Sequence, residues 1–168
     1  TRGMMGVVEG NFAVGFVRRI GIVAYTVFIS YAHEDKHFLA GLLKHLNILI
    51  KTGVISKWFD GDILPGSEWR NQIMNHVRTD QIILLLVSSD FIASDFCYSV
   101  EMVEALKRHH AGEARVIPIL VRPTLWQDTP LAELQILPSG AKPISTWSDR
   151  DLAFLDVAEG IKRVIQDL

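Results

Sequence analysis

Short apolar runs alternate with longer amphipathic segments from residue 25 to the end of the chain. The runs are rich in β-branched and aromatic residues and stop at polar or glycine-containing breaks, which is typical of buried strands. Gln81–Val87 is the most apolar run, and it predicts a central strand covered on both faces. The predicted strands are residues 26–30, 54–59, 81–87 and 116–121, with a weaker fifth strand at 143–146.

The segments between these strands have the three- and four-residue spacing of amphipathic helices. The predicted helices span residues 34–51, 67–77, 94–110 and 149–166, with Gly53 ending the first and Ser67 capping the second. Strands that alternate with helices imply an α/β fold with a parallel sheet. The simplest doubly wound solution is a flavodoxin-like five-stranded parallel sheet in the order 2-1-3-4-5, with helices on both faces. Pro118 indicates that the fourth strand lies towards an edge.

In a sheet of this kind, ligands bind beyond the carboxyl ends of the strands, where the winding direction reverses. That point lies between the first and third strands. Three segments are expected to meet there: residues 30–33, residues 60–69, and the chain from Ser88 into the helix that carries Glu101. Any chemistry is therefore expected in this crevice.

The composition indicates one globular domain that does not bind nucleic acid directly. Hydrophobic residues make up 49% of the 168 residues and charged residues 21%, which is enough apolar material for a core. Seventeen Lys and Arg residues against 19 Asp and Glu residues give a net charge of -2, so no basic field is present for a phosphate backbone. The single cysteine, Cys97, fits a reducing compartment, which we expect to be the cytoplasm.

Residues 1–24 are interpreted as an N-terminal extension of unknown role. Their apolar runs are interrupted by Arg18 and Arg19, so the pattern predicts neither a membrane span nor a signal peptide. We expect no membrane association. We also expect the chain to belong to a longer protein with a fused sensor or effector domain.

The usual phosphate-binding and metal-binding motifs are missing from the sequence. No GxGxxG follows the first strand, no GxxxxGK[ST] occurs, and the histidines lack metal-ligand spacing, so no cofactor and no metal are expected. Cys97 near a helix start has two interpretations, an activated nucleophile or a small buried hydrophobe. The second is favoured because the sequence places no histidine beside it.

Glu101 is ambiguous when the residues alone are considered. A helical wheel places it opposite an apolar stripe that includes Phe96, Val103 and Leu106, and this favours a solvated carboxylate. However, Glu101 has no basic residue three or four positions away, and its neighbours Cys97 and Tyr98 are uncharged, as in the wall of a pocket.

The predicted loop at residues 60–69 carries apolar residues between two glycines. Ile63, Leu64 and Pro65 form either a docking tip for a partner or a segment that folds back onto the domain. The sequence leaves both alternatives open.

Four blocks of sequence together resemble the Toll/interleukin-1 receptor (TIR) domain in its bacterial form. They are Val27–Asp35, Trp58–Trp69, Leu84–Phe91 and Ser94–Met102, in the order and spacing of that family. The resemblance covers residues 25–168, which we take as the domain. The family fold is the flavodoxin-like sheet described above.

The resemblance implies one of two functions. Many TIR domains cleave NAD+ at the nicotinamide–ribose bond, giving ADP-ribose or a cyclic isomer that signals in immune defence, in bacteria against phage. Others are non-catalytic modules that assemble signalling complexes. In either case, partners are expected to include other TIR domains in a homo-oligomer, and oligomerisation is expected to activate the enzyme.

Carried over residue by residue, the resemblance makes Glu101 the catalytic glutamate and NAD+ the substrate rather than a cofactor. The implied substrate-binding residues are Ser30, Tyr31, Ala32, Trp58, Asp60, Ser89, Cys97 and Tyr98. The implied interaction loop comprises Asp62, Ile63, Leu64, Pro65, Gly66 and Trp69. Cys97 stands where NAD-cleaving members often carry a tryptophan that stacks on the nucleotide, so Trp58, Phe59, Tyr31 and Tyr98 become candidates for that contact.

A receiver domain of the response-regulator type would share this topology. It requires clustered aspartates and a phosphoacceptor at the end of the third strand, where this chain has Ser88 and Ser89. We therefore discount it.

Overall fold

A computed structural model describes residues 24–63 and 70–168 of the chain. Its sheet has four parallel strands in the order β2-β1-β3-β4. The strands are β1 (Tyr25–Ala32), β2 (Ile55–Ile63), β3 (Ile82–Val87) and β4 (Arg115–Leu120). For these strands the predicted order is confirmed. The extension before Ala24 and residues 64–69 lie outside the described residues.

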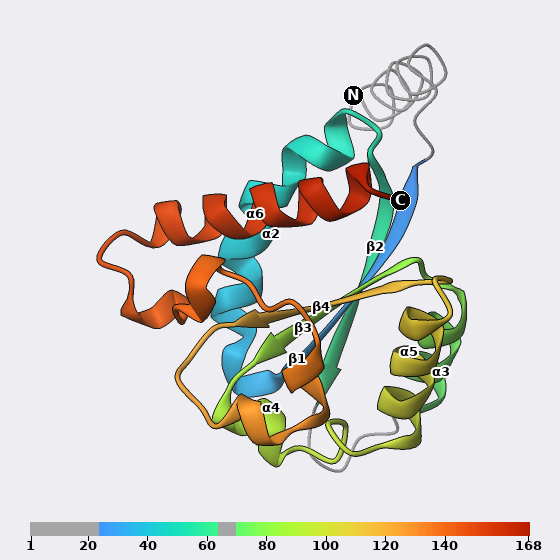
Figure 1. Cartoon of the computed structure of the whole chain (residues 1–168). Coiled ribbons are helices and arrows are strands. Elements are labelled where there is room, and N and C mark those ends of the chain that lie inside the picture. The colour runs from blue at the N-terminus through green and yellow to red at the C-terminus, as the bar shows by residue number, and fades with distance from the viewer. Residues whose placement is uncertain (1–23, 64–69) are drawn as a thin grey trace.

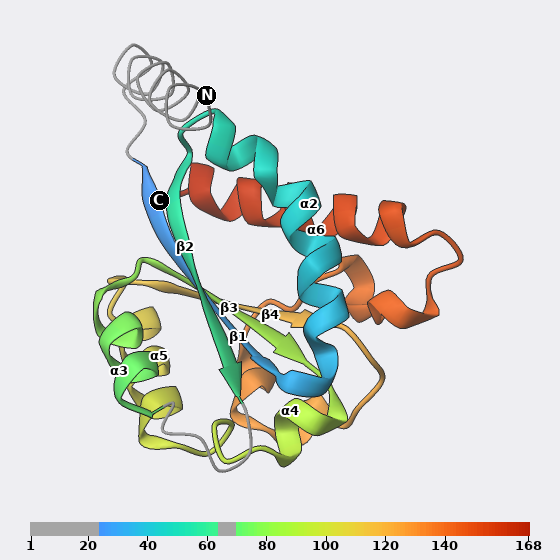
Figure 2. The same cartoon turned by 180° about the vertical axis from the view of Figure 1, so that it is seen from behind.

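Helices cover both faces of the sheet, as predicted (Figure 1). Figure 2 shows the same layers from behind, with α2 and α6 together on one side and α3 and α5 together on the other. The α-helices are α2 (Lys36–Lys51), α3 (Arg70–Thr79), α4 (Ser89–Ala93), α5 (Val100–His110) and α6 (Arg150–Gln166). Short 3-10 helices are η1 (His33–Asp35), η2 (Trp126–Asp128), η3 (Pro130–Glu133), η4 (Ser139–Ala141) and η5 (Ile144–Thr146). No helix in the described part of the chain has both the length and the apolar character needed to cross a bilayer.

The alternation of side chains along β1 divides the apolar interior into two cores. Val27, Ile29 and Tyr31 pack with α2 and α6, whereas Phe28 and Ala32 pack with α3 and α5. β3 is buried along its whole length, which confirms the central strand that its unbroken apolar run predicts.

The fifth strand predicted at residues 143–146 is wrong, because that segment forms the 3-10 helix η5. Among the described residues, Leu137 forms an isolated bridge to the outer edge of β4; its carbonyl accepts from the Leu120 N–H at 2.7 Å, and its N–H donates to the Pro118 carbonyl at 2.9 Å. Within residues 143–146, the Ser145 N–H donates to the Val121 carbonyl just after β4 at 3.0 Å. Pro138 and Pro143 have no N–H to donate, so a regular ladder cannot continue through them. β4 is therefore an edge of the described sheet, as Pro118 predicts.

Two predicted boundaries are also wrong. β2 continues through residues 60–63, which the sequence assigns to a loop. The helix predicted at 94–110 begins only at Val100, after α4 and a run of turns. Ser99 caps α5 by accepting the Met102 N–H at 3.2 Å, so the side chain that starts the helix lies six residues after Ala93.

Gly61 is required by close approach between β2 and β1. A Cβ atom at this position would lie 2.6 Å from the ring of Phe28 and 3.0 Å from the carbonyl oxygen of Ile29.

We therefore expect Gly61→Ala to lower the free energy of unfolding by about 1–3 kcal/mol, measured by urea denaturation. Lys57→Ala, an exposed position of the same strand, is the control and should change it little. Equal stability of the Gly61→Ala variant and the wild type would contradict this packing.

Candidate functional site

The candidate site lies where β1 and β2 end and α5 begins (Figure 1). The strand register places Ser30 beside Gly61 and Tyr31 beside Asp62. Ala32 shares a core with Met102 and Ala105 of α5. The ends of β1 and β2 are therefore paired, and the end of β1 faces the same apolar core as α5.

Glu101 is buried, with only 4% of its surface exposed, so the solvated position that the helical wheel favours is wrong. The inward residues of α5 are Glu101, Met102, Ala105 and Arg108. Val100 and Val103 are instead 68% and 64% exposed. The wheel fails because residues 94–99 are not helical, so Phe96 does not report the phase of α5.

Arg108 accounts for the rotation of α5. Its Nη1 atom donates to the carbonyl of Val77 in the last turn of α3 at 2.6 Å and to that of Asp80, just after α3, at 2.7 Å. Its Nη2 atom donates to the Glu113 carbonyl at 3.3 Å. These bonds hold one face of α5 against α3, and because Glu101 lies two turns before Arg108, it is turned inward as well.

Ser30 presents a buried hydroxyl on the α5 side of the sheet. Ser30 lies on the same face of β1 as Phe28 and Ala32, two residues from each, and this face packs against α3 and α5. Its Oγ atom has no hydrogen-bond partner among the described residues. Buried polar atoms are normally paired, so this one is free to donate to a ligand that enters from the strand ends.

Tyr31 points to the opposite face of the sheet from Ser30 and packs in the core against α2. Burial raises the pKa of its phenol, and the nearby carboxylates of Asp60 and Asp62 raise it further. The hydroxyl is therefore neutral at physiological pH, although it has no hydrogen bond of ordinary geometry in the described structure. The sequence resemblance groups Tyr31 with Ser30, but their side chains do not face the same space.

The end of β2 carries the remaining predicted residues. Asp60 is exposed and Trp58 is 38% exposed. Asp62 Oδ2 lies 2.9 Å from His33 Nδ1, which ties the turn after β1 to the end of β2. Ile63 ends the strand, and the other interaction-loop residues, Leu64, Pro65, Gly66 and Trp69, lie outside the described part of the chain.

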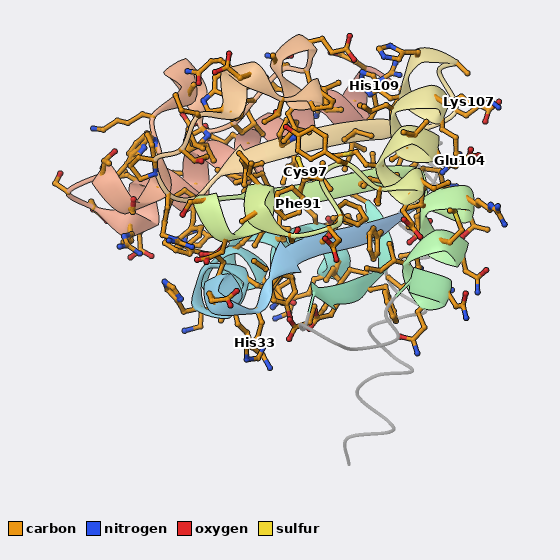
Figure 3. The ribbon with its side chains drawn as sticks, turned by 90° about the horizontal axis from the view of Figure 1, so that it is seen from below. His33, Phe91, Cys97, Glu104, Lys107 and His109 are labelled. Carbon is orange, nitrogen blue, oxygen red and sulfur yellow. The ribbon has the colours of Figure 1, made fainter. Side chains whose placement is uncertain are left out.

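Cys97 is fully buried with Phe91 and Phe96, which confirms it as a small hydrophobe. Burial raises the pKa of its thiol, the reverse of what a nucleophile needs. Figure 3 places Cys97 and Phe91 in the middle of the molecule, while His33 and Lys107 lie at its rim. Its predicted neighbours at the site, Ser89 and Tyr98, are exposed.

A buried polar network that the sequence analysis missed lies under the strand ends. Asp35 is completely buried, and its Oδ1 accepts from Arg122 Nε at 2.8 Å. Its Oδ2 accepts a short hydrogen bond from Ser88, and Arg122 also donates to Asp90. The hydrogen bond to Asp35 raises the pKa of Arg122, so the guanidinium stays charged. Asp35 and Arg122 are 87 residues apart, so no local pattern could have paired them.

In the described residues, no group of three or more His, Cys, Asp and Glu side chains is arranged to hold a metal ion. A separate groove of about 460 Å³ lies at the opposite end of β4. Its lining includes Arg115, His109, Leu137 and Arg163. None of the residues of the candidate site borders it.

Comparison with known families identifies the chain. The profile of the TIR domain matches residues 27–156, most of the sequence. The chain belongs to the TIR domain family. The matched region contains Ser30, Glu101 and the Asp35–Arg122 network.

Two further proteins are similar to this TIR domain. The uncharacterized protein y4lF of Sinorhizobium fredii is 47% identical over 137 residues, which cover 82% of this chain and 42% of that protein. The chain therefore spans less than half the length of this relative. The TIR domains of the activated Roq1 resistosome, directly recognizing the pathogen effector XopQ, superpose with a TM-score of 0.45 at 21% identity, over 85% of this chain and 84% of that one.

Cys97 is the one cysteine of the chain, so its reactivity can be measured without interference. Because the thiol is buried and its pKa is raised, we expect the folded TIR domain to react with Ellman's reagent at pH 8 at less than about one tenth of the rate of the urea-unfolded chain. A folded-state rate equal to that of the unfolded chain would show that Cys97 is accessible and could contact a ligand directly.

Proposed function

We propose that this TIR domain hydrolyses NAD+ at the nicotinamide–ribose bond, with Glu101 as the catalytic carboxylate. The observation that carries the proposal is the inverted arrangement of α5, which buries Glu101 and exposes Val100 and Val103. Each exposed valine forgoes about 1.5–3 kcal/mol of burial, and a buried carboxylate loses its hydration. An arrangement that works against stability in this way is typical of a functional site.

One carboxylate suffices for the proposed chemistry. The C–N bond between ribose and nicotinamide breaks with both electrons leaving on the nicotinamide, which departs as a neutral base and needs no proton. The ribose develops oxocarbenium character, as in glycoside hydrolysis. A fixed carboxylate stabilises that positive charge more in the transition state than in the ground state. Water then adds to the ribose and loses a proton to give ADP-ribose, or the adenine adds to give a cyclic isomer.

Ser30 supports the assignment of a ligand to this space. Its buried hydroxyl faces the α5 side of the sheet, where it can donate to a ribose oxygen of NAD+. Trp58, Asp60, Ser89 and Tyr98 are proposed as further substrate contacts, with Trp58 and Tyr98 available for stacking because both are exposed. Cys97 and Tyr31 shape the site from within the two cores.

The same proposal includes assembly with other TIR domains, and this assembly activates the enzyme. Tyr98, Val100 and Val103 leave an exposed apolar surface beside the buried Glu101. Exposed apolar side chains grouped around one helix start are typical of a contact with another protein. We place the active protein in the cytoplasm, in immune signalling such as defence against phage, with a fused domain that drives the assembly.

A non-catalytic interaction module is the second candidate function. The exposed Tyr98, Val100 and Val103 favour it, because such a surface serves docking whether or not Glu101 reacts. The two functions differ in one respect that can be measured, namely whether NAD+ turnover depends on Glu101.

We expect Glu101→Gln to fold normally and to lose at least about 100-fold in the rate of nicotinamide release, because it removes the stabilising charge while keeping the shape of the side chain. The assay follows nicotinamide release from NAD+ by chromatography, with the domain dilute and then crowded on beads. Glu104→Gln is the matched control on the next turn of the same helix, where the glutamate is only half-buried.

The outcomes separate the two functions. Release by the wild type and by Glu104→Gln, with loss in Glu101→Gln, is the expected result. Equal release by all three proteins would refute the role of Glu101. No release by crowded wild type would favour the interaction module.

A further inference from the structure

We propose that Asp35 and Arg122 are positioning residues that hold the ends of the strands around the NAD+ site. They act through the turn after β1 and do not contact the substrate. The inference rests on the proposed function for its effect on turnover. Its structural part, the ordering of the strand ends, can be tested without turnover.

The carboxylate of Asp35 joins three consecutive strands. Asp35 belongs to η1, immediately after β1, and is completely buried. Its bond from Ser88 reaches the end of β3, and its bond from Arg122 reaches the chain just after β4. β1, β3 and β4 are neighbours in the sheet, and the winding reverses between β1 and β3. The pair therefore lies under the point where the fold places a ligand.

Arg122 adds α4 to this connection. Its Nε atom bonds Asp35 while its Nη2 atom bonds Asp90, so one planar guanidinium spans two carboxylates. Ser88 contributes twice, because its Oγ donates to Asp35 and also accepts the Phe91 N–H at 3.1 Å at the start of α4. The position of α4 is thus fixed at its N-cap, Ser88, and at its second residue, Asp90.

The remaining strand, β2, is connected through His33, which belongs to η1 together with Asp35. His33 Nδ1 lies 2.9 Å from Asp62 Oδ2 at the end of β2. A chain of polar contacts therefore runs from Arg122 through Asp35 and η1 to Asp62. Ser30, whose buried hydroxyl has no partner among the described residues, lies in β1 three residues before η1.

Stability alone is a poor explanation for this ion pair, in which Asp35 is completely buried and the Arg122 side chain is 31% exposed. The attraction between the two charges is offset by the loss of their hydration, and well-packed apolar residues of similar volume often serve stability equally well. Apolar residues cannot form directional hydrogen bonds that join the end of one strand to the end of the next. Directional hydrogen bonds are needed at a site whose groups must be held in position within a fraction of an ångström.

The experiment compares variants of the pair with a matched arginine. Arg122→Gln removes the charge. Arg122→Lys keeps the charge but lacks the planar guanidinium that bonds Asp35 and Asp90 at the same time. Asp35→Leu combined with Arg122→Met replaces the pair by apolar side chains. Arg115→Ala is the control, since Arg115 begins the strand that Arg122 follows and forms no ion pair within the described residues.

Each protein is measured in three ways. Amide hydrogen exchange is followed in residues 30–36 and 88–93, thermal unfolding reports stability, and nicotinamide release gives kcat and KM. In Arg122→Gln we expect faster exchange in both segments and a kcat lower by about 100-fold. Arg122→Lys should recover part of the loss, and Arg115→Ala should match the wild type.

The apolar pair distinguishes positioning from stability. We expect it to restore the unfolding temperature towards that of the wild type while exchange stays fast and kcat stays low. Unchanged exchange in Arg122→Gln, or wild-type kcat in the apolar pair, would overturn the inference. If the wild type releases no nicotinamide, the proposed function has failed, and the exchange data alone decide whether the pair orders the strand ends.

Discussion

The rotation of α5 about its own axis is the constraint on which the candidate site depends. Arg108 fixes it by donating to the carbonyl of Val77 in the last turn of α3 and to that of Asp80 just after this helix. A guanidinium that is nearly buried and satisfied by backbone oxygens cannot turn to solvent without leaving those donors and acceptors unpaired. The residues on the same face of α5 follow Arg108 inward, and Glu101 is one of them.

This arrangement separates what stabilises the domain from what it is proposed to do. Two apolar cores and the backbone ladders of four strands hold the sheet together. At the carboxyl ends of the strands the interior becomes polar, with Asp35, Ser88 and Arg122 bonded to one another and Ser30 without a partner among the described residues. Polar groups at this position form directional hydrogen bonds, which a catalytic carboxylate and its substrate require for orientation.

Much of the fold could be predicted from the sequence, because strand and helix periodicity are local signals. β3 is an unbroken apolar run, and Pro118 correctly indicates an edge. The fifth strand was predicted although Pro138 and Pro143 argue locally against a regular ladder beside β4, because neither has an N–H to donate. The phase of α5 was misread because Phe96 belongs to a turn, and because the bonds of Arg108 to α3 are made across 28 and 31 residues.

The most direct test of the account is where NAD+ binds. Amide chemical shifts of 15N-labelled Glu101→Gln protein should be recorded as NAD+ is added, since this variant is expected to bind without turnover. The account predicts shifts centred on residues 30–32 and 100–102, with none in the groove beside Arg115 at the opposite end of β4. Shifts confined to that groove, or no shifts at saturating NAD+, would contradict it.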